Sequence, residues 1–521
     1  MPLSLAAPIA LLLLGIGWSF ASPHGSSADD DYHLTSIWCA HGPSEYCQES
    51  GDEVGVFAPR IIAYPACYVT WPATTSAACV SEVDYKLIYT QRVDPKDGRY
   101  PEGFYWAMAW MAGKDVVSSV QVMRIFNVAL AASLLGLALA VVRPALRRAV
   151  ALSWGVAIVP VGVFFIASTN PSSWTITGVG LYWAFLLSSL YSFRTRDHRF
   201  WLSLLGVGMA AFVALLSRND AGIYLALSTL VVAILAWREH ILPRWLLALG
   251  LSLLTIASIL VGYVSYRNSY LTLSLSFPGA QTATDQPNPL VKLLLELPGF
   301  FVGLVGGQRP INVLTDSGFN QGVDGYRPTG LLYGPGWAEM NLPSIVGISS
   351  LIAVAIVITV GFNSYQRSRV IAFAVLVVAT VTQIVIMRAM VDFAAVWEVQ
   401  PRYFIPILLV IIGVGALAKP TGKALMTRVQ AVTVMVLVIL SGSVAWMAVA
   451  ARYAVGPDAA FTNFGQPADW WWATGPSRLV WLCLTVLFTA LWVTATVWNY
   501  GAKPVGTGRD GKPGVRRRST R

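Results

Sequence analysis

The chain has 521 residues and a net charge of +10, and 55% of its residues are hydrophobic while only 12% are charged. Soluble globular proteins carry about 25% charged residues, so this composition excludes an ordinary soluble protein and indicates a surface that faces lipid. The basic excess does not indicate a nucleic-acid partner, because most arginines and lysines stand in short loops between apolar runs and in the tail.

Apolar runs long enough to cross a bilayer core of roughly 30 Å recur along the whole chain. The first covers residues 3–21, and we interpret it as an uncleaved helix because no lysine or arginine precedes it; a signal peptide ending near residue 22 is the alternative. The later runs cover 118–142, 150–168, 174–193, 201–217, 221–237, 245–264, 344–362, 370–388, 403–418, 429–450 and 479–499. The sequence therefore predicts an all-α membrane protein with about twelve transmembrane helices.

Basic residues follow all six even-numbered runs, at Arg143, Arg194, Arg238, Arg367 and Lys419, and at Arg516 in the tail after the twelfth. Positive charge favours the cytoplasmic side of a membrane, so both termini are predicted to be cytoplasmic. The predicted divisions are a first helix (1–21), an extracytoplasmic loop domain (22–117), helices two to seven (118–264), a second outward loop with a re-entrant or interfacial helix (265–343), helices eight to twelve (344–499) and a basic cytoplasmic tail (500–521).

Four of the five cysteines lie in the first outward loop: Cys39, Cys47, Cys67 and Cys79. An even set outside the cytoplasm predicts two disulfides. Three pairings are open, and we prefer the near neighbours, Cys39 with Cys47 and Cys67 with Cys79. A metal site that uses His41 is the alternative, although the spacing matches no zinc pattern. Cys483, in the last run, is predicted to be a buried thiol.

Three consecutive carboxylates, Asp29, Asp30 and Asp31, stand just beyond the first run. Adjacent carboxylates repel one another, which raises at least one pKa or attracts a cation. A carboxylate at this boundary could act as a general base on a hydroxyl group. Asp29 and Asp30 are also candidate ligands for a divalent cation, Mg²⁺ or Mn²⁺. A solvated acidic turn is the alternative interpretation.

Arginines on the outward side of a membrane run against the usual charge bias. Arg218 lies in the turn before the sixth run, Arg402 opens the tenth, and Arg124 lies about two turns into the second. The planar guanidinium group pairs well with phosphate, so phosphate binding is predicted for these residues. Contact with lipid headgroups, or pairing with Asp220, Asp392 or Glu398, is the alternative. No Walker loop is present in the sequence, which argues against ATP-driven transport by this chain.

Six short motifs follow one another along the chain: Asp29-Asp30 followed by His33, Tyr100-Pro101 with Phe104-Tyr105, Arg124 with Asn127, Asn170-Pro171-Ser172, Gly336-Trp337 with Leu342-Pro343, and Pro401-Arg402-Tyr403-Phe404 with Pro406. Their order and placement resemble a bacterial family of predicted polytopic membrane proteins of uncharacterised function, related to the GT-C superfamily of glycosyltransferases that use lipid-linked sugars. The third residue of the Asn-Pro turn is usually Asp in that family and is Ser172 here.

The resemblance implies an enzyme of a bacterial plasma membrane that transfers a sugar from a polyprenyl phosphate to an envelope glycan or lipid acceptor on the extracytoplasmic face. Asp29 would then be the base, with Asp30 and His33 as further catalytic residues, and Arg218, Arg402 and Arg124 as donor-phosphate ligands. A transporter or flippase of a lipid-linked glycan is one alternative, and it would need charges midway through the spans. An envelope glycan polymerase or ligase is another. Membrane lipids are expected partners, and nucleic acid is not.

Overall fold

The computed structural model describes residues 3–51, 54–69, 76–94, 100–238, 342–363, 366–390, 401–418, 423–456 and 476–503, together with residue 336 and parts of 245–260. The predicted second outward loop, with its re-entrant helix at 290–306, and the basic tail lie almost wholly outside the described residues. The seventh predicted span, 245–264, is described only in part.

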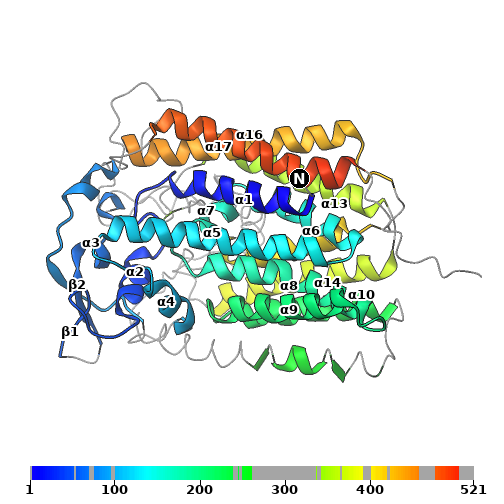
Figure 1. The fold of residues 1–521 in the computed structure, drawn as a ribbon, viewed down its shortest axis with the longest axis horizontal. Coiled ribbons are helices and arrows are strands. Elements are labelled where there is room, and N and C mark those ends of the chain that lie inside the picture. Colours follow the sequence, from blue (N-terminus) through cyan, green and yellow to red (C-terminus); the bar gives the residue numbers. More distant parts are fainter. Residues whose placement is uncertain are drawn as a thin grey trace, which may run out of the picture.

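The described chain is a bundle of helices with a small domain at one end (Figure 1). The bundle consists of α1 (Leu3–Ser19), α5 (Val116–Val141), α6 (Pro144–Ala157), α7 (Val161–Ile166), α8 (Ser172–Ser192), α9 (His198–Leu215), α10 (Ala221–Arg238), α13 (Ser344–Phe362), α14 (Arg367–Met390), η3 (Pro401–Phe404), α15 (Ile405–Ala416), α16 (Arg428–Val455), α17 (Arg478–Val493) and the π-helix η4 (Thr494–Ala502).

Among the described residues, six helices are long and apolar enough to cross a membrane: Val116–Val141, His198–Leu215, Ser344–Phe362, Arg367–Val385, Arg428–Val455 and Arg478–Ala502. Shorter apolar helices cover Leu5–Ser19, Ala221–Trp237 and Arg402–Ala416. A multi-pass helical membrane protein is therefore confirmed, while the count of twelve spans is not.

The prediction of one continuous span over 150–168 is wrong. Helix α6 begins earlier, at Pro144, and ends at Ala157, and a separate short helix, α7, begins at Val161. Pro160 lies between them. Proline lacks the N–H that an interior helix position needs, and the helix is interrupted before Pro160, so this apolar run forms two helices.

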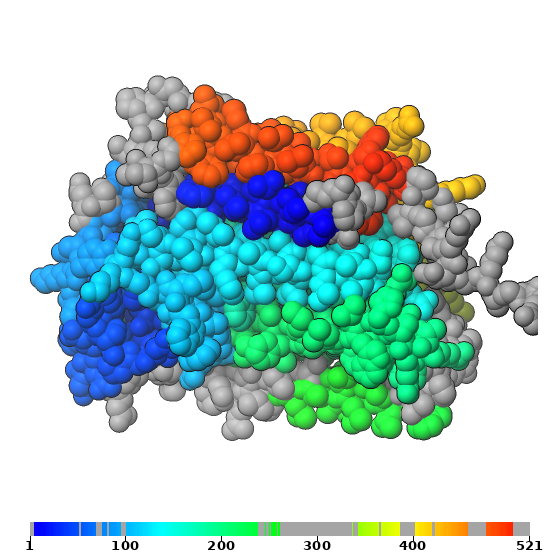
Figure 2. Space-filling model, viewed as in Figure 1, coloured from blue at the N-terminus to red at the C-terminus, as the bar shows by residue number. Residues whose placement is uncertain are grey.

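Helix α1 packs between α5 and α17, and it keeps one exposed face that includes Leu5 and Ile9 (Figure 2). Leu11, Leu14 and Trp18 are buried. Gly15 and Gly17 have no side chains, and the side chains of α5 and α17 lie directly against them, so an added Cβ would collide with either neighbour. Close approach at small residues is how helices associate where lipid offers no hydrophobic drive. The first helix is thus an integral part of the bundle.

The small domain covers one end of the bundle and is blue in Figure 2. It contains α2 (Asp30–Cys39), α3 (Arg60–Ala63), η1 (Cys67–Val69), η2 (Ala77–Glu82), α4 (Glu102–Ala109) and an antiparallel sheet of β1 (Gln48–Glu49), β2 (Val56–Pro59) and β3 (Leu87–Thr90). We call it the outer domain.

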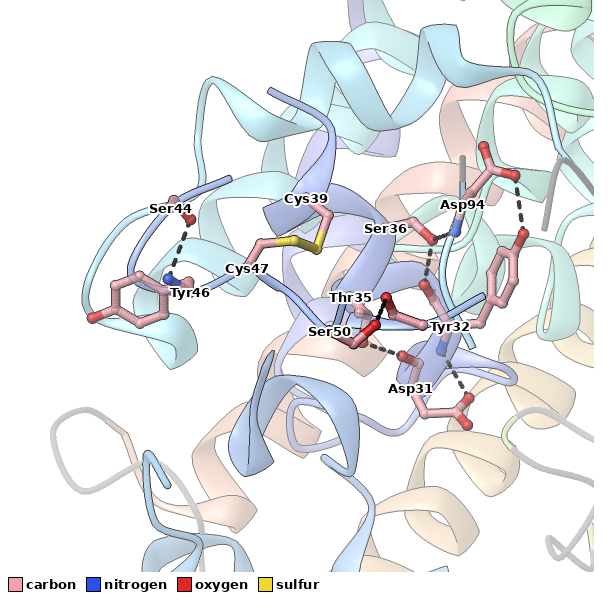
Figure 3. The surroundings of a disulfide bond; sticks show 11 residues. Asp31, Tyr32, Thr35, Ser36, Cys39, Ser44, Tyr46, Cys47, Ser50 and Asp94 are labelled. Atoms are coloured by element: carbon pink, nitrogen blue, oxygen red, sulfur yellow. Dashed lines mark hydrogen bonds between the residues drawn. A yellow bond between two sulfur atoms is a disulfide. The ribbon is translucent and has the colours of Figure 1, made fainter. Parts of the chain in front are cut away.

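Two disulfides brace the outer domain, and the preferred pairing is confirmed. Cys39–Cys47 joins the end of α2 to the segment that enters β1, as Figure 3 shows, and Cys67–Cys79 joins η1 to η2. The metal alternative is thereby excluded for these four cysteines. The prediction of a buried Cys483 is wrong, because this thiol is exposed on α17.

Removing the Cys67–Cys79 disulfide by a double substitution to serine is expected to cost about 3 kcal/mol of local stability, because the bridge closes a short loop that otherwise gains entropy on unfolding. Hydrogen exchange of the amides in η1 and η2 measures this free energy of local opening. Protection equal to that of the wild type would contradict the prediction.

Candidate functional site

The three aspartates stand where the chain turns from α1 into α2. Asp29 adopts a left-handed backbone conformation with φ 61° and ψ 23°, and α2 begins at the next residue. Aspartate is one of the few residues other than glycine that adopt this conformation at modest cost. The resulting turn directs Asp30 to partners of its own, whereas Asp29 and Asp31 share Arg92.

Asp29 is held between two arginines from distant parts of the sequence. Its Oδ1 lies 3.0 Å from Nη2 of Arg92, and its Oδ2 lies 3.7 Å from Nη2 of Arg402 in η3. Burial alone would raise the pKa of Asp29, but Arg402, His33 and Arg92 outweigh it and hold that pKa below the ordinary value. The side chain retains 38% of its exposure. Asp29 is therefore an ionised carboxylate that a bound molecule can reach.

Asp30 is fully buried, and its surroundings favour the protonated carboxyl group more than those of Asp29 do. Thr169 donates its hydroxyl to Oδ1 at 2.6 Å, and the backbone N–H of Ser27 donates to Oδ2 at 3.0 Å. Burial raises the pKa of Asp30 to about 7, although Arg124 and these hydrogen bonds favour the charged form. Asp30 thus ties α2 to the segment before α8, and it does not face the same space as Asp29.

The raised pKa of Asp30 predicts a pH-dependent stability. In an unfolded chain aspartate releases its proton near pH 3.9, whereas the folded protein holds it to about pH 7. Between these values the native state binds the extra proton, so this group's contribution to the free energy of unfolding falls as pH rises. Asp30→Asn, which cannot ionise, should gain stability over the wild type steadily across that interval.

The comparison uses melting temperatures of both proteins from pH 4.5 to 8. Burial lowers the pKa values of His24 and His33 to about 3, so these histidines make both proteins less stable as pH falls below 6.5. Their effect is common to both proteins, and the difference between the two melting curves therefore reports Asp30 alone. Parallel curves would contradict the assignment.

Asp31 pairs with Arg92, a residue that the sequence motifs did not indicate. Arg92 follows β3, and it contacts both carboxylate oxygens of Asp31 as well as Asp29. The neighbouring Asp94 accepts the Tyr32 hydroxyl at 3.1 Å, and its own N–H donates to Ser36, as Figure 3 shows. The segment 92–94 therefore fastens the chain after β3 to α2 within the outer domain.

His33 is a buried, neutral side chain at the centre of a hydrogen-bond network. The N–H of Ser172 donates to Oδ1 of Asn170 at 2.9 Å, which orients that amide so that its Nδ2 donates to Ala28 O and to Nε2 of His33, at 3.0 and 3.2 Å. The remaining ring nitrogen, Nδ1, then carries the proton and donates to the Tyr105 hydroxyl at 2.9 Å. Burial lowers the pKa of His33 to about 3. His33 therefore positions α2 against α4 and α8.

Arg218 and Arg402 meet at one aromatic ring. The guanidinium carbon of Arg218 lies 4.6 Å from the ring centre of Tyr403, and that of Arg402 lies 5.2 Å from the same centre. Arg218 forms a two-pronged pair with Asp220, with both N–O distances 2.9 Å, and is also 6.0 Å from the ring of Tyr100. The structure thus brings two of the three predicted phosphate ligands together beside Asp29.

Arg124 lies apart from this pair and is engaged with the backbone. It is buried, and its terminal nitrogens donate to the carbonyl oxygens of Ser19, Ser22 and Pro23 and to the Ser26 hydroxyl, at 2.7–3.2 Å. These oxygens belong to the end of α1 and the turn after it, where helix carbonyls have no partner within the helix. Arg124 thus closes the end of α1, and its terminal nitrogens are engaged with the chain rather than directed to Asp29.

The residues present do not fit a resident metal ion. Within the described part of the chain, no three His, Cys, Asp or Glu side chains converge to hold one. The oxygens of Asp29 face arginines, while those of Asp30 accept hydrogen bonds from Thr169 and Ser27. A divalent cation prefers several oxygen ligands, and the nearby guanidinium groups would repel it. We therefore derive no step through Mg²⁺ or Mn²⁺.

Fold and site together define a multi-pass helical membrane protein with a polar, charged cluster where its bundle meets the outer domain. Comparison with protein families agrees: residues 12–304, more than half of the chain, match the family described as Predicted membrane protein (DUF2142). The chain belongs to this family. No match was found among the curated proteins or among the solved structures.

Proposed function

We propose that the protein is a membrane glycosyltransferase of the GT-C type, which transfers a sugar from a polyprenyl-phosphate donor to an envelope glycan or lipid acceptor. One observation carries the proposal: the accessible carboxylate of Asp29 lies 3.7 Å from Arg402, so that a proton acceptor and an anion-binding group stand side by side. Arg218 adds a second cation at the same Tyr403 ring. Sugar transfer from a lipid phosphate would use the carboxylate to remove the acceptor's proton and the arginine to stabilise the leaving phosphate.

In the proposed reaction, the acceptor hydroxyl attacks the anomeric carbon of the donor sugar. Asp29 takes the hydroxyl proton, and the bond between the anomeric carbon and the phosphate oxygen breaks, so that its electron pair leaves with the polyprenyl phosphate. Arg402 and Arg218 stabilise the charge that develops on the phosphate oxygens. Asp30 and His33 act as positioning residues, because both are buried and bonded to the chain around Asn170 and Thr169.

The proposal places the site on the extracytoplasmic face of a bacterial plasma membrane, with both termini cytoplasmic and about twelve spans. Helix α8 separates the site from a basic end of the bundle: Ser172, at its start, contacts Arg218, whereas Tyr191, near its end, accepts a hydrogen bond from Arg143. Its 21 residues reach about 30 Å, the thickness of a bilayer core. Arginines such as Arg143 favour the cytoplasmic side, which supports the outward placement of Asp29.

A flippase of a lipid-linked glycan is the second candidate, since it too would bind a lipid phosphate through arginine. The described ionised groups of the site sit at helix ends, in the turns around α2, α9 and η3, rather than midway along a path through the bundle. An envelope glycan polymerase or ligase would also use outward arginines but would not require an accessible base. The Asp29 carboxylate favours direct sugar transfer.

The test is transfer by the purified protein in nanodiscs, supplied with a panel of polyprenyl-phosphate sugars and short envelope glycans as acceptors. Elongated acceptor is the expected product. The same protein in liposomes, assayed for movement of a fluorescent polyprenyl-phosphate sugar between leaflets, tests the flippase. Movement between leaflets without any transfer would overturn the proposal.

A further inference from the structure

Among the described residues, Arg402 makes only long contacts: one ion pair and two with aromatic rings. Its nearest carboxylate oxygen, Oδ2 of Asp29, is 3.7 Å away, which is beyond hydrogen-bond distance. Its guanidinium group is otherwise placed by two aromatic rings, Phe165 at 5.3 Å and Tyr403 at 5.2 Å. Within the part of the chain that the structure describes, Arg402 forms no hydrogen bond. Aromatic faces orient a guanidinium group without occupying its donors.

The other arginines near the site are committed to oxygen partners at short range. Arg218 grips Asp220 with two nitrogens, Arg92 contacts Asp31 and Asp29, and Arg124 donates to backbone carbonyls. Each of these would have to break hydrogen bonds before it could bind a ligand. Among the described residues, Arg402 would have to give up only a long ion pair, so a phosphate that reaches its 9% exposed side chain meets the least competition there.

Asp29 is placed so that losing Arg402 changes its chemistry without moving it. Its Oδ1 keeps the 3.0 Å contact with Arg92, and its backbone is fixed at the start of α2. The Oδ2 that faces Arg402 is then the oxygen left without a cation. An unpaired carboxylate oxygen is a stronger proton acceptor than one paired with arginine.

We propose that Arg402 exchanges Asp29 for the phosphate of the donor lipid, so that Asp29 is released to accept the acceptor's proton only once the donor is bound. This rests on the proposed function and adds an order to it: donor first, acceptor second. While the site is empty, the opposite charges of Arg402 and Asp29 offset each other until a donor binds.

The charges balance through the reaction. The donor is a phosphodiester with one negative charge, and the departing polyprenyl phosphate is a monoester that carries between one and two at neutral pH. Asp29 becomes neutral when it takes the hydroxyl proton, so it no longer competes for Arg402 at the moment when the phosphate gains charge. Proton transfer to Asp29 therefore leaves Arg402 free to stabilise the departing phosphate.

Competition between Asp29 and phosphate for one arginine has an unusual consequence that binding can test. We expect Asp29→Asn to bind undecaprenyl phosphate about tenfold more tightly than the wild type, because the competing carboxylate is gone. Asparagine and glycine both adopt the left-handed conformation of Asp29, so Asp29→Gly serves as a second variant with the same expectation. Arg402→Gln should weaken binding at least about tenfold. Binding is measured in phosphatidylcholine nanodiscs by competition with a fluorescent analogue.

The matched control is Asp31→Asn, which removes an adjacent carboxylate that pairs with Arg92 instead of Arg402. It should change the affinity less than about twofold. Equal tightening in Asp31→Asn and Asp29→Asn would mean a general charge effect and would overturn the exchange, as would unchanged or weaker binding in both Asp29 variants. Inorganic phosphate, run in parallel, should show the same ranking at lower affinity if the phosphate group alone is recognised.

Two outcomes separate the exchange from the proposed function. If the wild type transfers sugar but loss of Asp29 does not raise the affinity for undecaprenyl phosphate, the exchange alone is refuted. If the wild type neither binds the lipid nor transfers sugar, the proposed function is refuted.

Discussion

Replacing Asp29 by asparagine is expected to lower the rate of sugar transfer by about 10³-fold, the usual contribution of a positioned general base. Asparagine preserves the left-handed turn before α2 and removes the ionised oxygen that faces Arg402. The folded structure should therefore persist while proton removal from the acceptor fails. Initial rates at saturating donor, together with melting temperatures, separate these two effects.

The neighbouring carboxylate supplies the control for this experiment. Asp31 carries the same charge but points to Arg92 rather than to Arg402, and it is less exposed than Asp29. Asp31→Asn should retain activity within about tenfold of the wild type, because Arg92 then keeps Asp29 as its partner. Transfer by Asp29→Asn at more than a tenth of the wild-type rate would show that another group removes the proton.

Replacing Arg124 by methionine is expected to have the largest effect on stability, about 3–5 kcal/mol. The guanidinium group donates to three backbone carbonyls and one hydroxyl around the end of α1, all of them buried. Methionine fills similar space but leaves these acceptors without a donor, and each buried acceptor that loses its partner costs about 1–3 kcal/mol. Thermal unfolding of detergent-purified protein, followed by tryptophan fluorescence, measures the loss.

Arg147→Met is the comparison for this substitution. Arg147 also donates to two backbone carbonyls, of Val142 and Ala140, but it lies partly exposed at the opposite, basic end of the bundle. Water can replace it there, so the expected cost is below about 1 kcal/mol. If Arg124→Met were as stable as the wild type and lost only lipid-phosphate binding, Arg124 would be a phosphate ligand after all.

The outline of the fold could be read from the sequence because apolar runs and basic loops are local signals. The first helix and the loop segment after it followed from these signals, whereas the disulfide pairing was a preference for near neighbours among three open pairings. The number of spans did not, because a proline interrupts the run that forms α6 and α7, and several apolar helices are shorter than a bilayer. Run length reports hydrophobicity, whereas helix ends depend on backbone chemistry.

Site residues at the ends of predicted spans could be predicted from the sequence, whereas partners that are distant along the chain could not. Asp29, Arg218 and Arg402 could be proposed because charges at a membrane boundary are uncommon. Arg92 lies in an irregular segment without periodicity, and its pairing with residues 29 and 31 is purely tertiary. Its position in the outward loop, beside the acidic Asp94, was the one local sign.

The roles of His33 and Arg124 depended on burial, which the sequence does not state. Both are ionisable types that chemistry often uses, and both turn out to be enclosed with their hydrogen-bonding groups directed at neighbouring chain segments. Asp29 and Asp30 are adjacent in sequence, yet one stays ionised between arginines while the other is buried with a raised pKa. Tertiary surroundings assign different chemistry to identical residues.

The most direct measurement is a cryo-electron microscopy map of the Asp29→Asn protein in nanodiscs with a polyprenyl-phosphate sugar, since this variant should bind the donor and fail to consume it. The account predicts density for the phosphate against Arg402 and Arg218 at the Tyr403 ring, with the sugar directed toward residue 29. Phosphate density at the opposite end of α8, or a donor bound with its sugar away from residue 29, would contradict it.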